Sequence, residues 1–304
     1  MVPEQSTYPE FLVQNGGFSA ARGRAGYRLG GVLAHFVMRF TLRALFAGAL
    51  TLGVPSALPA QIAAPTVNQS GKDAPWVPTS PELVDKMLDL AEVKPRDFVI
   101  DLGSGDGRNV IAAARRGAHA LGVEYDPALV ELSRRLAKEA GVGDKAAFVQ
   151  GDMYQADVSR ATVLALFLVP ENLDKLQSKF LAMKPGTRIV LNTFSVTDWD
   201  PDASSTIGAP CNTWCTANLL IVPAQVAGTW RVGNAELNLK QYYQVVRGTI
   251  GTEEVIGRLR GDQITLTAGG TEFKARVIGK RMVGTATTAG KARPWTATRL
   301  IPTP

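Results

Sequence analysis

The sequence predicts an α/β fold followed by a smaller β-rich domain, and three observations lead to this prediction. Between about 75 and 200, short apolar runs alternate with helical patterns, which is typical of a parallel sheet covered on both faces. A glycine-rich turn follows the first of these runs, as expected where a strand leads into a helix beside a ligand. From about 219, helical periodicity disappears, and short β-rich runs are separated by turns that contain glycine.

The first 60 residues are expected to be a leader that lies outside the fold. Residues 38–60 combine a basic start, an apolar stretch of 11 residues and a small-residue exit, which is the pattern of a secretory signal peptide. The apolar stretch is too short to span a bilayer comfortably, so membrane contact is expected to be transient. Cleavage near Ala60 would give an exported protein, periplasmic or secreted, and Met38 is a candidate start. The alternative is a disordered tail or a short membrane-associated helix on a cytoplasmic or membrane-anchored protein.

The α/β part is expected to start with a helix that Ser80 caps and Pro81 opens. Strands and helices then alternate, and glycines mark several of the helix ends. The elements expected after the first helix are strand 98–100, helix 108–116, strand 119–123, helix 127–140, strand 147–149, strand 161–168, helix 171–183 and strand 188–191. Ligands of such sheets bind beyond the carboxyl ends of the strands.

The last third of the chain is expected to form an antiparallel barrel or sandwich. It is either a packed accessory domain or a binding site for a ligand or an acceptor protein. Its first β-rich run is also suited to complete the preceding sheet. The runs are 219–222, 228–232, 237–246, 254–259, 264–267 and 273–278. The predicted divisions are a leader (1–60), a linker (61–74), an α/β domain (75–222) and a β-rich domain (223–304).

The net charge of +6 gives little information about partners. The first 60 residues contribute +3, and the other +3 is interpreted as thinly spread, so no nucleic-acid partner is expected. With two histidines and two cysteines, the chain cannot build a multi-histidine zinc site, and no metal is expected. Cys211 and Cys215 would form a disulfide in an exported protein, with two unpaired thiols as the alternative.

The most specific motif is Asp101-Leu-Gly-Ser-Gly-Asp-Gly107, at the end of the first predicted strand. Its three glycines permit a tight turn and a close approach of a ligand to the backbone. The dinucleotide-binding fingerprint would require glycine at 108, where this chain has arginine. An acid before the glycines also suits an ammonium group better than a pyrophosphate.

Two further acids follow the next two predicted strands. Glu124 ends the second strand, where a carboxylate can accept hydrogen bonds from both hydroxyls of a ribose. After the third strand, Asp152 is placed to accept from an adenine amino group, and Met153 to pack on the ring. Three acids at three successive strand ends match an adenosine that carries an amino acid, and S-adenosylmethionine is such a molecule.

With these residues, the segment 75–200 resembles the class I S-adenosylmethionine-dependent methyltransferases, whose sheet is Rossmann-like. The resemblance implies S-adenosylmethionine as the cofactor. Asp101, Gly103 and Gly105 would then hold its methionine end, Glu124 its ribose and Asp152 its adenine. The predicted cofactor-binding set is completed by Ser104, Gly107, Tyr125 and Met153.

Three segments resemble a narrower group: Trp76-Val-Pro-Thr79, the glycine motif with Arg108, and Phe167-Leu-Val-Pro-Glu-Asn172. They are similar to the lysine methyltransferases of the mitochondrial inner membrane and to bacterial relatives. The mitochondrial enzymes modify subunit c of ATP synthase and the adenine nucleotide translocase. The resemblance implies that the first and third segments line a methyl-transfer channel. The predicted catalytic residues are Trp76, Phe167, Pro170 and Glu171.

Methyl transfer to an amine is a displacement at a sulfonium, for which the protein supplies position and a dry channel. Desolvation in an apolar channel would lower the pKa of a lysine nucleophile. Phe194 and Trp199 are further candidates for the wall of this channel, and the alternative for both is core packing. Glu171 or Asp198 would orient the amine, although a helix-dipole role fits Glu171 as well. We therefore predict a monomeric protein-lysine N-methyltransferase. The alternatives are a small-molecule methyltransferase and an exported S-adenosylmethionine-binding protein without turnover.

Overall fold

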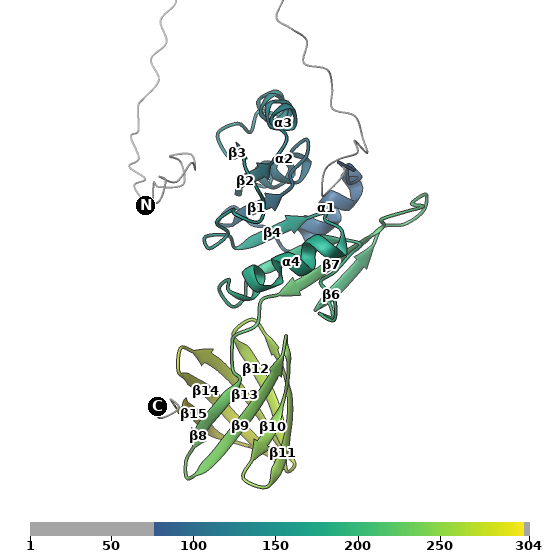
Figure 1. Ribbon diagram of the computed structural model, residues 1–304. Coiled ribbons are helices and arrows are strands. Elements are labelled where there is room, and N and C mark those ends of the chain that lie inside the picture. The colour runs from purple at the N-terminus through teal and green to yellow at the C-terminus, as the bar shows by residue number, and fades with distance from the viewer. Residues whose placement is uncertain (1–75, 301–304) are drawn as a thin grey trace, which may run out of the picture. The chain divides into compact units, whose positions relative to one another are not determined.

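The computed structural model describes residues 76–300, so the predicted signal peptide and linker lie outside the described residues. Within this range the chain forms a mixed α/β sheet followed by a closed β-barrel (Figure 1), which confirms the predicted fold class. None of the helices between 76 and 300 has the length and apolar character needed to cross a membrane.

The sheet has seven strands in the order β3-β2-β1-β4-β5-β7-β6. The five strands from β3 to β5 are parallel, and β7 lies antiparallel to β5. The chain leaves β1 toward β2 and β3 on one side and returns to β4 on the other, so the strand order reverses at β1. The carboxyl ends of β1 and β4 therefore frame the usual ligand position of such a sheet. The strands are β1 (Phe98–Leu102), β2 (His119–Glu124), β3 (Ala146–Gln150), β4 (Val163–Leu166), β5 (Arg188–Asn192), β6 (Ala203–Thr206) and β7 (Thr216–Ile221).

Four helices accompany this sheet, and two of them have the predicted caps. Ser80 Oγ accepts a hydrogen bond from Leu83 N at 3.3 Å, and Asp126 Oδ1 accepts one from Ala128 N at 2.9 Å. Helix α1 contacts β5, β6 and β7, whereas α2 and α3 contact β2 and β3. The helices are α1 (Pro81–Leu90), α2 (Arg108–Arg115), α3 (Pro127–Glu139) and α4 (Pro170–Leu181).

The β-rich part is a barrel, not a sandwich. Eight antiparallel strands close on themselves in the order β10-β11-β12-β13-β14-β15-β8-β9. Large side chains fill the interior, among them Trp230, Leu239, Phe273 and Met282, as expected for an eight-stranded barrel. The strands are β8 (Gly228–Val232), β9 (Ala235–Tyr242), β10 (Val245–Ile250), β11 (Glu253–Arg260), β12 (Gln263–Ala268), β13 (Thr271–Ile278), β14 (Arg281–Thr288) and β15 (Lys291–Arg299).

The β-rich half contains the largest differences from the sequence prediction. The predicted single run 237–246 is two strands, because Tyr243 adopts a φ of 49° in a turn that contains no glycine. Strands β6, β14 and β15 were not predicted, and Gly284 and Pro294 interrupt the usual strand pattern in the last two. The run 219–222 does complete the first sheet, as part of β7.

The interpretation of the charge as thinly spread is wrong. Residues 61–222 contain 16 basic and 20 acidic residues, which gives a net charge of −4. Residues 223–304 contain 12 basic and 5 acidic residues, which gives +7. The small total therefore conceals two parts of opposite charge, and the barrel is the basic one.

Candidate functional site

The glycine motif forms a loop that leads from β1 into α2. Gly103 N and Ser104 N both donate to Val123 O, at 2.8 and 3.1 Å, so the loop is attached to β2. Gly105 has a φ of 56°, and a Cβ there would lie 2.6 Å from Nε1 of Trp76. Glycine is required at this position for two reasons, the backbone angle and the packing of an indole ring against the loop.

Asp101 is the acid at the centre of the site. Its side chain is 3% exposed, and its Oδ2 accepts a hydrogen bond from Asn109 Nδ2 at 3.1 Å. Asn109 also donates to Ala165 O at 3.3 Å, which fixes the amide between β1 and β4. Burial raises the pKa of Asp101 well above its usual range, and the nearby charges of Glu124 and Asp106 raise it further. A carboxyl group in this setting is suited to receive a cation.

Buried polar atoms without a hydrogen-bond partner gather in the same region. Among residues 76–300, five of the seven such side-chain atoms belong to β1, β5 or the turns and helix start that follow them. Buried polar groups are normally paired, so this concentration indicates the position of a polar ligand. The five atoms are Asp101 Oδ1, Ser104 Oγ, Asn109 Oδ1, Asn192 Oδ1 and Thr193 Oγ1.

Glu124 connects the glycine loop to the start of α3. Its Oε2 accepts from Gly105 N at 2.8 Å, and its Oε1 accepts from Asp126 N at 2.9 Å. Each carboxylate oxygen has a second lone pair, so both can still accept from ribose hydroxyls. Tyr125, the next residue, is exposed. The ribose-binding role of Glu124 remains a prediction that this geometry permits.

The predicted adenine side of the site follows β3. Asp152 is exposed, and its Oδ1 accepts from Tyr154 N at 2.8 Å, whereas Met153 is half-buried. The hydroxyl of Tyr154 donates to Asn172 Oδ1 at 3.0 Å, which ties this loop to the first turn of α4. Because β3, β2 and β1 are neighbours and parallel, the three predicted acids lie along one edge of the sheet.

Three aromatic rings form a second cluster, which we call the aromatic cluster: Phe167, Phe194 and Trp214. Phe167 stacks on Phe194 with ring centroids 6.3 Å apart, and it meets Trp214 edge-on at 5.5 Å. The residue after Phe167 is Leu168, whose Cδ2 would lie 3.4 Å from a Cβ on Gly103. The chain that carries Phe167 is thus next to the glycine loop through Leu168, and the aromatic cluster contains two of the predicted channel residues.

Trp214 was not among the predicted site residues. It lies between Cys211 and Cys215, and these cysteines form the predicted disulfide, which closes a short loop between β6 and β7. Its side chain is 42% exposed although it contacts Phe167. The two cysteines that bracket a tryptophan were the only sequence signal for this residue.

Other predicted channel residues have different positions. Trp199 as a channel wall is wrong, because its ring is 1% exposed and stacks on Tyr243 with centroids 4.8 Å apart. Asp198 Oδ2 accepts from Tyr242 OH at 3.3 Å, so it faces the β9–β10 turn. Glu171 is exposed in the first turn of α4, the place where an acid complements the helix dipole, and Pro170 opens that helix.

The segment before α1 belongs to the site. It is held there by hydrogen bonds that could not be predicted from the sequence. Asn192 Nδ2, at the end of β5, donates to Thr79 Oγ1 at 3.1 Å. Arg108 also donates to Thr79 O, and its guanidinium pairs with Asp106 inside the glycine loop at 2.6 Å. The segment that carries Trp76 is therefore held against β5 and the start of α2.

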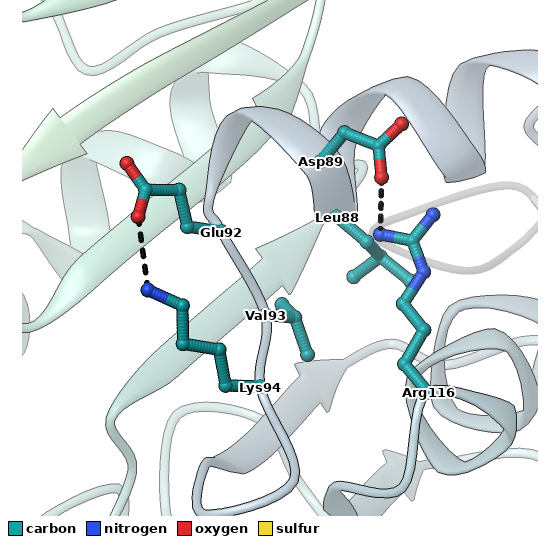
Figure 2. A pocket seen from close by; sticks show the side chains of 6 residues that line it. All are labelled: Leu88, Asp89, Glu92, Val93, Lys94 and Arg116. Atoms are coloured by element: carbon teal, nitrogen blue, oxygen red, sulfur yellow. Dashed lines mark hydrogen bonds and ion pairs between the residues drawn. The ribbon is translucent and has the colours of Figure 1, made fainter.

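A surface pocket of ≈ 380 Å³ lies away from this site. Its lining comes from the ends of α1 and α2 and from the turn that precedes β1, as Figure 2 shows. Its lining residues form two ion pairs, between Glu92 and Lys94 at 3.1 Å and between Asp89 and Arg116 at 2.9 Å. Since these elements meet where β1 begins, the pocket is at the amino edge of the sheet and is not the ligand position.

Comparisons with known proteins agree with this geometry. Residues 101–203 match the family model of the ANTKMT methyltransferase domain. A protein-lysine N-methyltransferase of Saccharolobus islandicus is 37% identical over 130 residues, which cover 42% of this chain and 81% of that protein. The adenine nucleotide translocase lysine N-methyltransferase of Mus musculus is 36% identical over 131 residues, or 42% of this chain, but the match spans only 57% of the mouse protein.

A solved structure was also found. It is described as an RNA methyltransferase from Salinibacter ruber in complex with S-adenosyl-L-homocysteine, and it is 43% identical, with a TM-score of 0.46. The match covers 49% of this chain and 96% of that chain. On the extent of the match to the Saccharolobus protein, this chain belongs to the S-adenosylmethionine-dependent methyltransferases of the ANTKMT methyltransferase domain family.

Proposed function

We propose that this chain transfers a methyl group from S-adenosylmethionine to a lysine side chain of a protein acceptor. The observation that carries the proposal is that the buried, partly unpaired carboxyl group of Asp101 and the aromatic cluster lie at the same edge of the sheet. The Saccharolobus and mouse relatives are both protein-lysine methyltransferases, and they share this part of the chain.

The residues at the strand ends fit the cofactor. The free Oδ1 of Asp101 and the backbone of the glycine loop suit an amino-acid end, and Glu124 and Asp152 suit the ribose and the adenine. When bound there, S-adenosylmethionine supplies an activated methyl group on a sulfonium centre. Asp101 and Ser104 would orient its methionine end, while Trp76 covers the loop and excludes water.

The aromatic cluster is suited to the acceptor amine. Phe167, Phe194 and Trp214 provide an apolar surface, which disfavours the charged form of a lysine and lowers its pKa toward the neutral nucleophile. No side chain has to act as a base in this arrangement, because water can take the proton before the amine enters.

The test uses purified protein, tritiated S-adenosylmethionine, and membrane and soluble fractions from the source cell. We expect a labelled protein band whose acid hydrolysate contains methyl-lysine, and we expect Asp101→Asn to reduce the label strongly when the cofactor is below saturation. Label in RNA or in a small molecule would replace the proposed acceptor with that class. Cofactor binding without label in any fraction would instead support a binding protein without turnover.

We infer that the protein is also exported. The leader-like pattern of residues 38–60 and a disulfide between Cys211 and Cys215 both support this localisation. The test is N-terminal sequencing of the protein from its native cell. A mature start near Gln61 supports export, and an intact N-terminus contradicts cleavage and favours a cytoplasmic or membrane-anchored protein.

A further inference from the structure

The outer surface of the barrel carries the excess positive charge of the chain. Residues 223–304 hold 12 basic residues against 5 acidic ones, and strands β14 and β15 contain no acidic residue. Side chains that point into the barrel are apolar, so these cations lie outside. The barrel therefore presents a basic surface that the proposed methyl transfer does not use.

One hairpin on this surface mixes cations with exposed aliphatic side chains. Strands β13 and β14 pair Arg276 with Val283 and Ile278 with Arg281, so each aliphatic residue has an arginine directly across the ladder. Ile278 is 60% exposed and Val283 is 39% exposed, so both present apolar surface to solvent between the arginines. We call this set the hairpin patch, and its members are Lys274, Arg276, Ile278, Lys280, Arg281 and Val283.

Only part of the charge of the hairpin patch is neutralised within the protein. Lys274 pairs with Glu272 at 2.8 Å, and Arg276 pairs with Asp262 at 3.3 Å. Within the described range of the chain, Lys280 and Arg281 take part in no ion pair. Lys280 lies in the turn of the hairpin, and Arg281 begins β14 directly across the ladder from Ile278.

We propose that the hairpin patch binds the surface of an anionic phospholipid bilayer. Cations near such a surface are attracted to its headgroups, and aliphatic side chains gain by entering the boundary between headgroups and acyl chains. Single-stranded nucleic acid would instead require exposed rings for base stacking beside these cations. The hairpin patch contains no ring, Trp230 and Trp295 are buried inside the barrel, and the exposed ring of Tyr242 belongs to β9. A closed barrel also leaves no strand edge for a peptide to extend.

The test is co-sedimentation of the full chain with vesicles of phosphatidylcholine, alone or with phosphatidylglycerol, at low and high salt. Because residues 44–54 are themselves apolar, the comparison is made between variants of one full-length background. The electrostatic attraction is removed by the double variant Lys280→Glu/Arg281→Glu. The apolar contact is removed by the single variant Ile278→Ser. The matched control is Lys291→Glu/Arg293→Glu, the same charge change at the opposite end of the barrel.

We expect the double variant to partition about tenfold or more weakly onto anionic vesicles, since each surface cation contributes about 1 kcal/mol near such a membrane. Ile278→Ser should weaken binding severalfold, and high salt should remove the difference between wild type and the double variant. Circular dichroism melting confirms that each variant is folded. Equal losses in the hairpin variant and in the matched control would overturn the proposal, as would unchanged partition of the hairpin variant. Tighter binding to a single-stranded RNA than to anionic vesicles would overturn it in favour of nucleic acid.

Discussion

Asp101 combines two properties that conflict in the absence of a ligand. It is almost completely buried, and one of its oxygens has no hydrogen-bond donor in the described part of the chain. Burial without a full set of partners destabilises the ionised form. A bound ammonium group would remove the free-energy cost of burying this carboxylate, so relief of that cost would contribute to the affinity for the ligand.

The first prediction concerns the charge of this residue. We expect Asp101→Asn to weaken S-adenosylmethionine binding by about 10- to 100-fold, the size of a hydrogen bond between charged groups. We also expect it to raise or preserve the melting temperature, since an amide is less costly to bury than a carboxylate. Calorimetry and thermal melting measure the two effects, with the exposed Asp144→Asn as the control. Unchanged cofactor affinity in Asp101→Asn would remove this residue from the site.

The second prediction is a pH dependence that follows from the raised pKa of Asp101. The folded protein binds this proton more tightly than the unfolded chain, in which the pKa is about 3.9. Asp101 therefore destabilises the fold as pH rises above that value, and the effect is complete once pH passes the folded pKa. Cofactor affinity should instead increase as pH rises, because the ionised form of Asp101 receives the ammonium group.

This pH dependence is measured by binding titrations between pH 4 and pH 8, each run in two buffers of different ionisation enthalpy. In wild type, binding should release a proton at pH values below the folded pKa of Asp101. In Asp101→Asn, this proton release should be absent. Identical proton release in the two proteins would assign the titration to another group.

At the scale of elements, the loop between β6 and β7 is the part whose position depends on a covalent bond. The Cys211–Cys215 disulfide fixes the residues around Trp214, and Trp214 is the exposed member of the aromatic cluster. Without the bond, this loop gains conformational freedom, and the indole is held only by its contact with Phe167.

We therefore expect Cys211→Ser/Cys215→Ser to raise the KM for the methyl acceptor severalfold and to leave cofactor affinity unchanged. Trp214→Ala should reproduce the effect, and dithiothreitol should affect wild type but not the double serine variant. Steady-state kinetics with varied acceptor, together with cofactor calorimetry, separates the two binding steps. A matching loss of cofactor affinity would mean that the loop supports the glycine loop instead of the acceptor.

The elements of the α/β part were largely predictable because their signals are local. Apolar runs, proline and serine or aspartate caps, and glycine stops fix helices α1 to α3 within a few residues. The turn at Tyr243 was missed because no glycine marks it. Its ring packs on Trp199, which is a tertiary contact that the local sequence does not reveal. The same distinction applies to the residues of the site. The acids at the strand ends could be predicted from the sequence, whereas Asn109, Asn192 and Trp214 reach the site through long-range contacts.

At the scale of the whole molecule, the sheet and the barrel share contacts at several places, and the β9–β10 turn makes one set of them. The Tyr243 ring stacks on Trp199, and its hydroxyl donates to Thr197 O at 3.1 Å. The adjacent Gln244 donates through Nε2 to Asp200 O at 2.7 Å. These contacts join the β9–β10 turn to the segment that follows β5, so Trp199, which was predicted as part of a channel wall, connects the two parts instead.

The last prediction follows from this connection. If the turn couples the two parts, residues 76–300 should unfold in a single cooperative transition in wild type. Tyr243→Ala removes an aromatic pair worth about 0.5–1.5 kcal/mol beyond its buried area, and it leaves a cavity against Trp199. We expect the variant to unfold in two resolved transitions by differential scanning calorimetry, the barrel and the sheet each on its own. Ile256→Ala, which shortens an exposed side chain on β11 of the barrel, should keep the single transition. A single transition in Tyr243→Ala, shifted only to lower temperature, would show that other contacts couple the sheet to the barrel.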